Sequence, residues 1–436
     1  MQRKKCSRAL ASALVIAAAA LTLGGAARAS TYKIIHQFGL AKKPLGNLTI
    51  DAAGNLYGTT FYGGDSTACT TALGGCGVVW KLAPNGRLTM LHQFTGPPDG
   101  AWPDAGLVFD AAGNLYGTTS AGGDPTVCPS SQSPGGCGVV FELKPNPAGT
   151  WTESVLHTFT GGADGAAPTA GLIFDAAGNL YGTTYFGGSN STSCYFGGCG
   201  IAFKLAPKPD GTWTESVLYS FTGGGDGSNP SAGLVSDAAG NLYGTTWEGG
   251  NLTDCDGGSC GVVFKLTPNR DETWTESVLH SFSCGDGALA QGVVFDTAGN
   301  LYGTTFGSNT GCQETVYKLQ PNPDGTWAES TLYRFIGGVG GFFPNGGLIF
   351  DAAGNLYGTT FFGGFEGETT TCAYSGCGVV FKLTPTSSGW KETVLWKFLG
   401  VGANPGAPVI FDKQGNLYGT TTSGTGNYGV VFKIKP

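Results

Sequence analysis

The sequence predicts an all-β protein, a seven-bladed β-propeller with four antiparallel strands in each blade. Three observations lead to this prediction. A heptapeptide, Gly-Asn-Leu-Tyr-Gly-Thr-Thr, recurs at intervals of 55 to 65 residues. Each interval holds four short segments with the side-chain alternation of strands. The seven copies start at Gly54, Gly113, Gly178, Gly240, Gly299, Gly354 and Gly415. Seven is a number at which four-stranded blades close into a ring.

The third repeat unit shows the four expected strands in order. Residues 170–175 (AGLIFD) form the first, and a turn at 176–178 leads into the second, 179–184 (NLYGTT). After a variable loop, 200–205 (GIAFKL) form the third and 213–221 (WTESVLYSF) the fourth. Glycine, proline, asparagine and aspartate mark the boundaries as turns. A parallel β-helix is the main alternative, but its coils are much shorter than a repeat of about 60 residues.

The chain ends favour the ring. The last unit has its first three strands, of which the third is 429–434, and the chain then stops at Pro436 without a fourth. Residues 32–38 (YKIIHQF) match the fourth-strand pattern and precede the first complete unit. We therefore expect this N-terminal strand to pair with 429–434 and complete the last blade. Such closure removes open sheet edges, and a solenoid would not need it.

Residues 1–29 are predicted to be a cleaved signal peptide. A positively charged start (Arg3 to Arg8) is followed by an apolar stretch of about 15 residues, 9–23, and by Ala27-Arg28-Ala29, an A-x-A cleavage pattern. The apolar stretch is short for a membrane span. Residues 30–436 are then a single propeller domain that is secreted, either to the periplasm or outside the cell, with no membrane span.

The expected mature chain is acidic. Without the five basic residues of positions 1–29, 18 basic and 30 acidic residues remain, which gives a net charge of −12. This argues against a nucleic-acid partner, because nucleic-acid binding depends on basic surfaces. We expect a soluble monomer.

Twelve cysteines follow the signal peptide, an even number that suits disulfides in a secreted protein. The expected pairs are Cys69 with Cys76, Cys128 with Cys137, Cys194 with Cys199, Cys255 with Cys260, Cys372 with Cys377, and Cys284 with Cys312. In a four-stranded meander, the loops that carry all twelve emerge on one face. Metal binding by the Cys-x4-Cys pairs is the alternative, but the spacing drifts between repeats and no histidine is near. We expect no metal and no cofactor.

The repeat motif resembles a known family. The pattern GLxFDAAGNLYGTT followed by CGVVFKL is similar to that of the GloVer tandem repeat proteins, the "choice-of-anchor" repeat proteins of bacteria. The resemblance covers nearly all of the mature chain. It implies an exported bacterial protein that often carries a C-terminal sorting anchor. No anchor-like tail follows 429–436 here, so we expect free secretion. The resemblance implies no established activity.

Two sets of polar residues recur with the repeat, and repetition favours a structural role for both. His36, His92, His157 and His280 occupy one repeat position where other units have tyrosine or tryptophan, as in an aromatic packing slot. The seven aspartates that end the first strands are Asp51, Asp110, Asp175, Asp237, Asp296, Asp351 and Asp412. Aspartate at the start of a turn accepts backbone N–H groups. A cation-binding ring at one mouth of the channel is the alternative.

Function is then expected in the loops where the repeats differ, on the disulfide-bearing face. The candidate ligand-binding residues are Phe61, Tyr62, Trp102, Tyr185, Phe186, Trp247, Phe361 and Phe362. Aromatic rings beside carboxylates and amides suit sugar rings or a protein partner. The structural alternative is that aromatic residues directly after Gly-Thr-Thr seal the gap between adjacent blades.

The leading functional hypothesis is a binding module for an extracellular glycan or protein. An enzyme, a polysaccharide lyase or hydrolase, is the first alternative. Its candidate acid and base are Glu248 with Asp254 or Asp256, because glycosidic bond cleavage uses paired carboxylates. A purely structural surface module is the second alternative.

Overall fold

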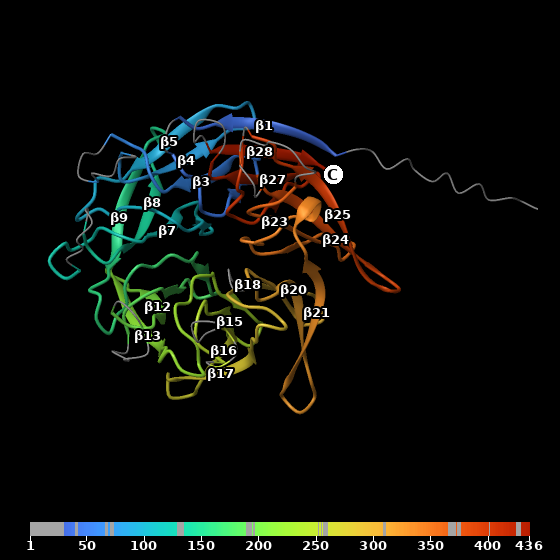
Figure 1. Ribbon diagram of the computed structural model, residues 1–436. Coiled ribbons are helices and arrows are strands. Elements are labelled where there is room, and N and C mark those ends of the chain that lie inside the picture. Colours follow the sequence, from blue (N-terminus) through green and yellow to red (C-terminus); the bar gives the residue numbers. More distant parts are fainter. Residues whose placement is uncertain are drawn as a thin grey trace, which may run out of the picture.

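The computed structural model describes residues 30–39, 42–65, 69, 74–128, 135–188, 194, 197–251, 253, 255, 260–307, 311–364, 372, 376–400, 402–423 and 429–436. These residues form seven four-stranded antiparallel sheets that follow one another around a ring (Figure 1). The predicted seven-bladed propeller is confirmed. The helical content of this described part is one 3-10 turn, Gly338–Gly340, and none of its helices has the length and apolarity needed to cross a membrane.

The blades are numbered along the chain, and their strands run from the ring centre outward. Blades 1 to 4 consist of β2 (Thr49–Ile50), β3 (Leu56–Thr60), β4 (Val78–Leu82) and β5 (Leu88–Gln93); β6 (Val108–Phe109), β7 (Leu115–Thr119), β8 (Val139–Pro145) and β9 (Trp151–Thr158); β10 (Ile173–Phe174), β11 (Leu180–Thr184), β12 (Ile201–Pro207) and β13 (Trp213–Ser220); and β14 (Val235–Ser236), β15 (Leu242–Thr245), β16 (Val262–Pro268) and β17 (Trp274–Ser281). Blades 5 to 7 consist of β18 (Ala290–Phe295), β19 (Leu301–Thr305), β20 (Glu314–Pro321) and β21 (Trp327–Phe335); β22 (Ile349–Phe350), β23 (Leu356–Thr360), β24 (Val379–Thr386) and β25 (Gly389–Lys397); and β26 (Ile410–Phe411), β27 (Leu417–Thr421), β28 (Val430–Lys435) and β1 (Thr31–Gln37).

The N-terminal strand closes the ring as predicted. β1 pairs antiparallel with β28, with Tyr32 opposite Ile434 and Lys33 opposite Lys433. In Figure 1 the blue β1 runs beside the red C-terminal strands. Tyr32 also stacks on Trp396 of blade 6, with ring centroids 4.2 Å apart and planes at 4°. Strand β1 is therefore hydrogen-bonded into blade 7 and also packs against blade 6.

In six blades the innermost strand has two residues and is shorter than the sequence predicts, whereas β18 of blade 5 has six. In the third unit β10 spans Ile173–Phe174, whereas we expected a strand over 170–175. The reason lies in the neighbouring blade: the carbonyl of Ala170 accepts the Thr118 hydroxyl of blade 2 at 3.3 Å. This segment thus divides its hydrogen bonds between two blades, and only Ile173 and Phe174 pair with β11 of their own sheet.

The first half of the repeated heptapeptide builds a turn. In blade 1 the Asp51 carboxylate accepts the backbone N–H groups of Ala53 and Asn55, the Asn55 side-chain amide at 2.7 Å, and the Tyr57 hydroxyl at 3.1 Å. Gly54 has φ +82°, a conformation that glycine adopts without strain. The same four hydrogen bonds recur at Asp110, Asp175, Asp237, Asp296, Asp351 and Asp412. The aspartates serve the turns, as their position predicted.

The second half of the heptapeptide joins neighbouring strands and blades. A β-carbon on Gly117 would lie 2.7 Å from the Phe141 ring, so glycine is needed to let that ring fill the blade core. The hydroxyl of Thr359 donates to the Ala407 carbonyl of the next blade at 3.1 Å. The hydroxyl of Thr360 accepts the backbone N–H of Val379. The glycines, the asparagine, the tyrosine and the threonines of the motif therefore each have a structural task.

Candidate ligand-binding surfaces

All six predicted disulfides are present, and they define one face of the ring. The bonds are Cys69–Cys76, Cys128–Cys137, Cys194–Cys199, Cys255–Cys260, Cys284–Cys312 and Cys372–Cys377. Eleven of the twelve cysteines lie in loops between the second and third strands, and Cys284 lies between blades 4 and 5. We call this side the disulfide face. Oxidised cysteines cannot serve as thiolate ligands, so the Cys-x4-Cys metal alternative is wrong.

The connections between blades place variable side chains on this face. Short antiparallel bridges join five of these connections to the residues that follow Gly-Thr-Thr, as in Ser228 with Glu248 and Phe342 with Phe362. Beside each bridge stands a residue in the left-handed backbone region, for example Trp102 at φ 61° and Phe343 at φ 55°. Such strained positions persist only when the surrounding structure holds them. The loop backbone is therefore well supported.

Six aromatic side chains of blades 4 to 6 form a continuous row on the disulfide face, which we call the aromatic arc. Its members are Trp247, Phe306, Phe342, Phe343, Phe361 and Phe362. Trp247 lies 5.5 Å from Phe306, which stacks on Phe343 at 4.6 Å, and Phe343 meets Phe362 at 5.7 Å between ring centroids. All six side chains are half-buried.

The other predicted aromatic residues form two smaller groups. Phe61 stacks on Trp102, with centroids 5.5 Å apart, and meets the edge of Tyr62 at 4.7 Å. Tyr185 and Phe186 of blade 3 meet at 4.8 Å. These rings are half-buried too. Phe61 and Trp102 join blade 1 to the connection that leads into blade 2, whereas Tyr185 and Phe186 contact each other within blade 3. Part of each ring stays exposed, so these residues can both pack and bind a ligand.

The structure adds one residue that the sequence analysis had not singled out. Phe306 and Phe343 connect Trp247 to Phe361 and Phe362, and Phe306 was not among the aromatic residues expected on this face. Phe306 follows Gly-Thr-Thr directly, as Trp247 does, and that shared position was the signal that could have identified it.

The candidate acid–base set remains a prediction. Glu248 is half-buried beside Trp247, and burial raises the pKa of its carboxyl. The charge of Glu248 in turn contributes, after burial, to a raised pKa of Tyr185. Asp254 and Asp256 lie outside the described residues. In the described part of the chain, no group of three or more histidine, cysteine, aspartate and glutamate side chains is placed to hold a metal ion.

The histidines pack in the outer strands, as their repeat position predicted. His92 meets Phe94 edge-on at 4.8 Å, and its Nε2 lies 3.0 Å from the Asp99 carboxylate. His280 has the same relation to Phe282, at 4.7 Å, and to Asp286, at 3.0 Å. The Asp-Gly turns between blades therefore hold these rings in place.

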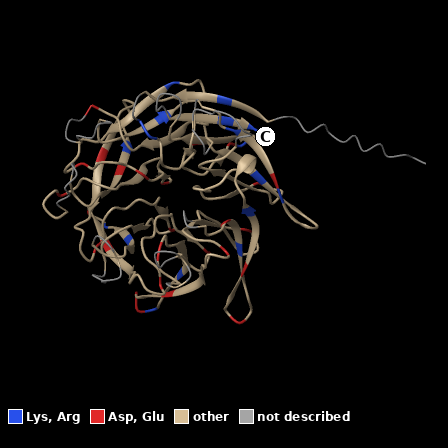
Figure 2. Cartoon of the chain, viewed as in Figure 1, with Lys and Arg blue, Asp and Glu red and all other residues tan. Residues whose placement is uncertain are grey.

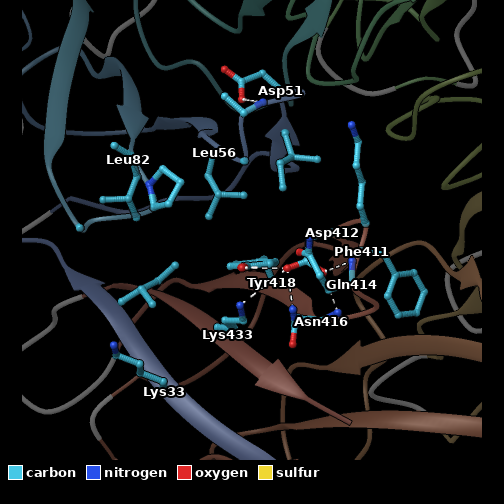
Figure 3. A pocket seen from close by; sticks show the side chains of 18 of the residues that line it. Lys33, Asp51, Leu56, Leu82, Phe411, Asp412, Gln414, Asn416, Tyr418 and Lys433 are labelled. Atoms are coloured by element: carbon cyan, nitrogen blue, oxygen red, sulfur yellow. Dashed lines mark hydrogen bonds and ion pairs between the residues drawn. The ribbon is translucent and has the colours of Figure 1, made fainter.

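A concave site that the sequence analysis missed lies on the opposite face, at the junction of blades 7 and 1. The pocket has a volume of about 1260 Å³, and its walls come from both blades (Figure 3). A smaller pocket of about 560 Å³ lies at the junction of blades 1 and 2. One feature of the sequence could have indicated the larger pocket. The fourth strand of the first unit, residues 88–93, lacks the Trp-x-Glu pattern of later units.

The comparisons with known proteins agree with the repeat and the fold. The family described as the Gloeobacter/Verrucomicrobia repeat matches residues 23–255 and 252–436. No curated protein matches the chain.

Three solved structures are similar to this chain at low identity. An ancestral GH74 enzyme is 12% identical with a TM-score of 0.54, covering 91% of this chain and 48% of its own. An extracellular domain from B. thetaiotaomicron, assigned to a hybrid two-component system, is 12% identical with a TM-score of 0.49, covering 93% of this chain and 41% of its own. The PQQ-bound aldose sugar dehydrogenase of Streptomyces coelicolor is 11% identical with a TM-score of 0.42, covering 84% and 98%. This chain thus spans less than half of the first two. At 12% identity the similarity to the GH74 enzyme shows the fold alone.

Proposed function

The chain belongs to the Gloeobacter/Verrucomicrobia repeat family, and we propose that it is an exported binding protein that holds an extracellular glycan on its disulfide face. Family membership accounts for the repeat and the ring but names no ligand. The observation that carries the proposal is the aromatic arc, which joins three blades in one row of partly exposed rings.

The chemistry of the arc suits a sugar chain. The C–H faces of pyranose rings stack on aromatic side chains, and rings placed a few ångströms apart can follow successive sugar units. Trp247 stands at one end of the arc, and Glu248 beside it supplies a carboxyl group for sugar hydroxyls. A site of aromatic walls with few polar groups is the usual form of a small-ligand site.

The loops that carry the arc are fixed before a ligand arrives. Phe361 donates its backbone N–H to the Phe343 carbonyl at 2.8 Å, and the Asn404 side chain donates to the Phe361 carbonyl at 2.9 Å. The disulfides Cys284–Cys312 and Cys372–Cys377 close loops on the same face. A preorganised site loses less conformational entropy on binding.

Export supports the same reading. Six disulfides are typical of proteins that mature in an oxidising compartment, either the periplasm or the outside of the cell. We propose that residues 1–29 direct the chain there as a cleaved signal peptide, and that the mature protein acts as a monomer.

The test is a glycan array probed with purified mature protein, followed by calorimetry on the sugars that bind. Trp247→Ala and Phe343→Ala are expected to weaken binding by at least about tenfold, since buried aromatic contacts dominate such interfaces. Phe109→Ala, which removes a half-buried ring from strand β6 and outside the arc, is the matched control. Binding that survives both arc variants would contradict the proposal.

Two further outcomes of this test separate the alternatives. Release of reducing or unsaturated sugars that disappears in Glu248→Gln would establish the enzyme instead. If no glycan bound and a protein bound through the intact arc instead, the ligand would be a protein partner and not a glycan.

A further inference from the structure

The sevenfold repeat is interrupted at the junction of blades 7 and 1, which we call the seam. At five other junctions, a tryptophan that starts the outer strand packs edge-on against the heptapeptide tyrosine of the preceding blade. These pairs are Tyr57–Trp151, Tyr116–Trp213, Tyr181–Trp274, Tyr243–Trp327 and Tyr302–Trp390, with centroids 6.1 to 6.5 Å apart. Blade 1 has no such tryptophan, because its β4–β5 hairpin turns at Ala83–Arg87 and β5 begins at Leu88.

A second substitution enlarges the gap at the seam. Phe109 of blade 2 meets Tyr57 of blade 1 edge-on at 5.0 Å. Four other phenylalanines meet the heptapeptide tyrosine of the preceding blade in the same way: Phe174, Phe295, Phe350 and Phe411. Ile50 takes this position in blade 1. The tyrosine on the other side of the seam, Tyr418, is therefore left without either ring.

The consequence is visible in the exposure of the tyrosines. The six heptapeptide tyrosines at the other junctions are 4 to 8% exposed, whereas Tyr418 is only half-buried. The space in front of it is the pocket of about 1260 Å³. Figure 3 shows Tyr418, Asp412 and Asn416 on one side and Leu56, Leu82 and Asp51 on the other. Where Trp151 is present, at the junction of blades 1 and 2, the pocket measures about 560 Å³.

Four lysines line this pocket, in a chain whose net charge is negative. They are Lys33, Lys413, Lys433 and Lys435. Lys33 lies directly opposite Lys433 in the β1–β28 ladder, and Lys435 is paired with Thr31 on the same side. Like charges placed directly opposite each other destabilise a sheet, so this arrangement favours an anion between them. Figure 2 shows basic positions along these strands and acidic positions spread around the ring.

The two acids of the pocket are already engaged. Asp51 and Asp412 each accept two backbone N–H groups, an asparagine amide and a tyrosine hydroxyl. Lys433 Nζ lies 3.7 Å from Asp412 and 5.0 Å from the centroid of the Tyr418 ring. Lys33, Lys413 and Lys435 are exposed, which leaves their ammonium groups accessible to a ligand.

We propose that the seam pocket is a second binding site, which takes an anionic oligosaccharide bearing carboxylate or sulfate groups. The lysines of both strands of the β1–β28 ladder attract the anionic groups. The apolar wall of Ile35, Ile50, Leu56 and Leu82 accepts the C–H face of a sugar ring, and the amides of Asn85 and Gln414 are placed for its hydroxyls. The ring-shaped ligand occupies the space that a tryptophan fills at five of the other junctions.

Calorimetry with tetragalacturonate, a chondroitin sulfate tetrasaccharide and cellotetraose tests the proposal. We expect one or both anionic probes to bind, more weakly at higher salt, and the neutral probe not to bind. The variant Lys33→Gln/Lys435→Gln is expected to lose at least about tenfold in affinity, since each contact from a charged donor contributes strongly. Ile50→Phe, which restores the ring found in five other blades, is expected to cover Tyr418 as those rings cover their tyrosines and to weaken binding at least about tenfold while the fold is retained.

The controls keep the two binding sites apart. Lys144 occupies in blade 2 the position of Lys435, and Lys391 is an exposed lysine of blade 6, so Lys144→Gln/Lys391→Gln removes the same charge elsewhere. This control and Trp247→Ala should bind anionic probes as the native protein does. No binding of either anionic probe, an equal loss in the control pair, or full binding by Ile50→Phe would overturn the proposal without bearing on the aromatic arc.

Discussion

Three glutamates of the outer strands make the stability of this protein depend on pH in an unusual direction. Glu153, Glu215 and Glu276 are glutamates of the Trp-x-Glu pattern. Each lies near the aspartate of the Asp-Gly turn that precedes its blade. Burial, and then the charge of the neighbouring aspartate, raises the pKa of each glutamate to about 7. One carboxyl oxygen of each is buried and makes no hydrogen bond to the described residues.

The sign follows from the direction of these shifts. Because the folded-state pKa lies above the unfolded value of 4.5, the folded protein binds these protons more tightly. The contribution to stability is fully present below about pH 4.5 and is lost as the pH rises through about 7. The shift corresponds to an upper limit of about 3 kcal/mol for each group, and solvent at these half-buried sites reduces it to about 1 to 2 kcal/mol.

The triple variant Glu153→Gln/Glu215→Gln/Glu276→Gln mimics the protonated state at every pH. At pH 8.5 it should unfold at a temperature about 4 to 7 °C higher than the native protein, from a total of about 3 to 6 kcal/mol over a chain of about 400 residues. At pH 5 the two proteins should have the same melting temperature. Calorimetric scans across this range measure both.

The comparison with the variant removes the contribution of other titrating groups. Burial raises the pKa of Asp51, but hydrogen bonds to its carboxylate outweigh this and hold the pKa below its usual value. Burial lowers the pKa of His157. Both are unchanged in the triple variant. Glu272→Gln, at an exposed turn, is the matched control and should show no pH-dependent gain. If the triple variant were no more stable than the native protein at pH 8.5, the assignment of buried, repelled carboxyls would be refuted.

Three further predictions concern the ring itself. Deleting residues 30–38 should lower the melting temperature sharply and produce aggregates in size-exclusion chromatography, because it reopens the edge of β28, whereas deleting residues 1–29 should do neither. Gly117→Ala should lower the free energy of unfolding by about 1 to 3 kcal/mol in denaturant titrations, because its β-carbon would meet Phe141 at 2.7 Å; Gly162→Ala, with its nearest contact at 3.7 Å, should change it little. Asp175→Ala should cost about 2 kcal/mol by the same measurement, since four donors lose their acceptor, and a value near zero would show that the turn does not depend on the carboxylate.

The architecture could be read from the sequence because it rests on short-range and repeated signals. Asp51 and Gly54 specify a turn through hydrogen bonds and a backbone angle that involve only a few neighbouring residues. Seven copies of such a unit leave few ways to bury their apolar faces, and an orphan strand at 32–38 indicates a ring. The disulfides were predictable for the same reason, since five of the six pairs close loops of nine residues or fewer.

The binding surfaces depended on contacts between different repeats, which no single repeat encodes. The aromatic arc exists because Phe306 and Phe343 come from different blades and meet at 4.6 Å. The seam pocket exists because the first and last blades, whose strands are far apart in the sequence, become neighbours only on ring closure. The sequence by itself determined the blade, its turns, its disulfides and the closing strand, all through local hydrogen bonding and periodic burial. Only the tertiary structure decided which non-repeating side chains share a surface, because their proximity is set by the curvature of the ring and not by their spacing along the chain.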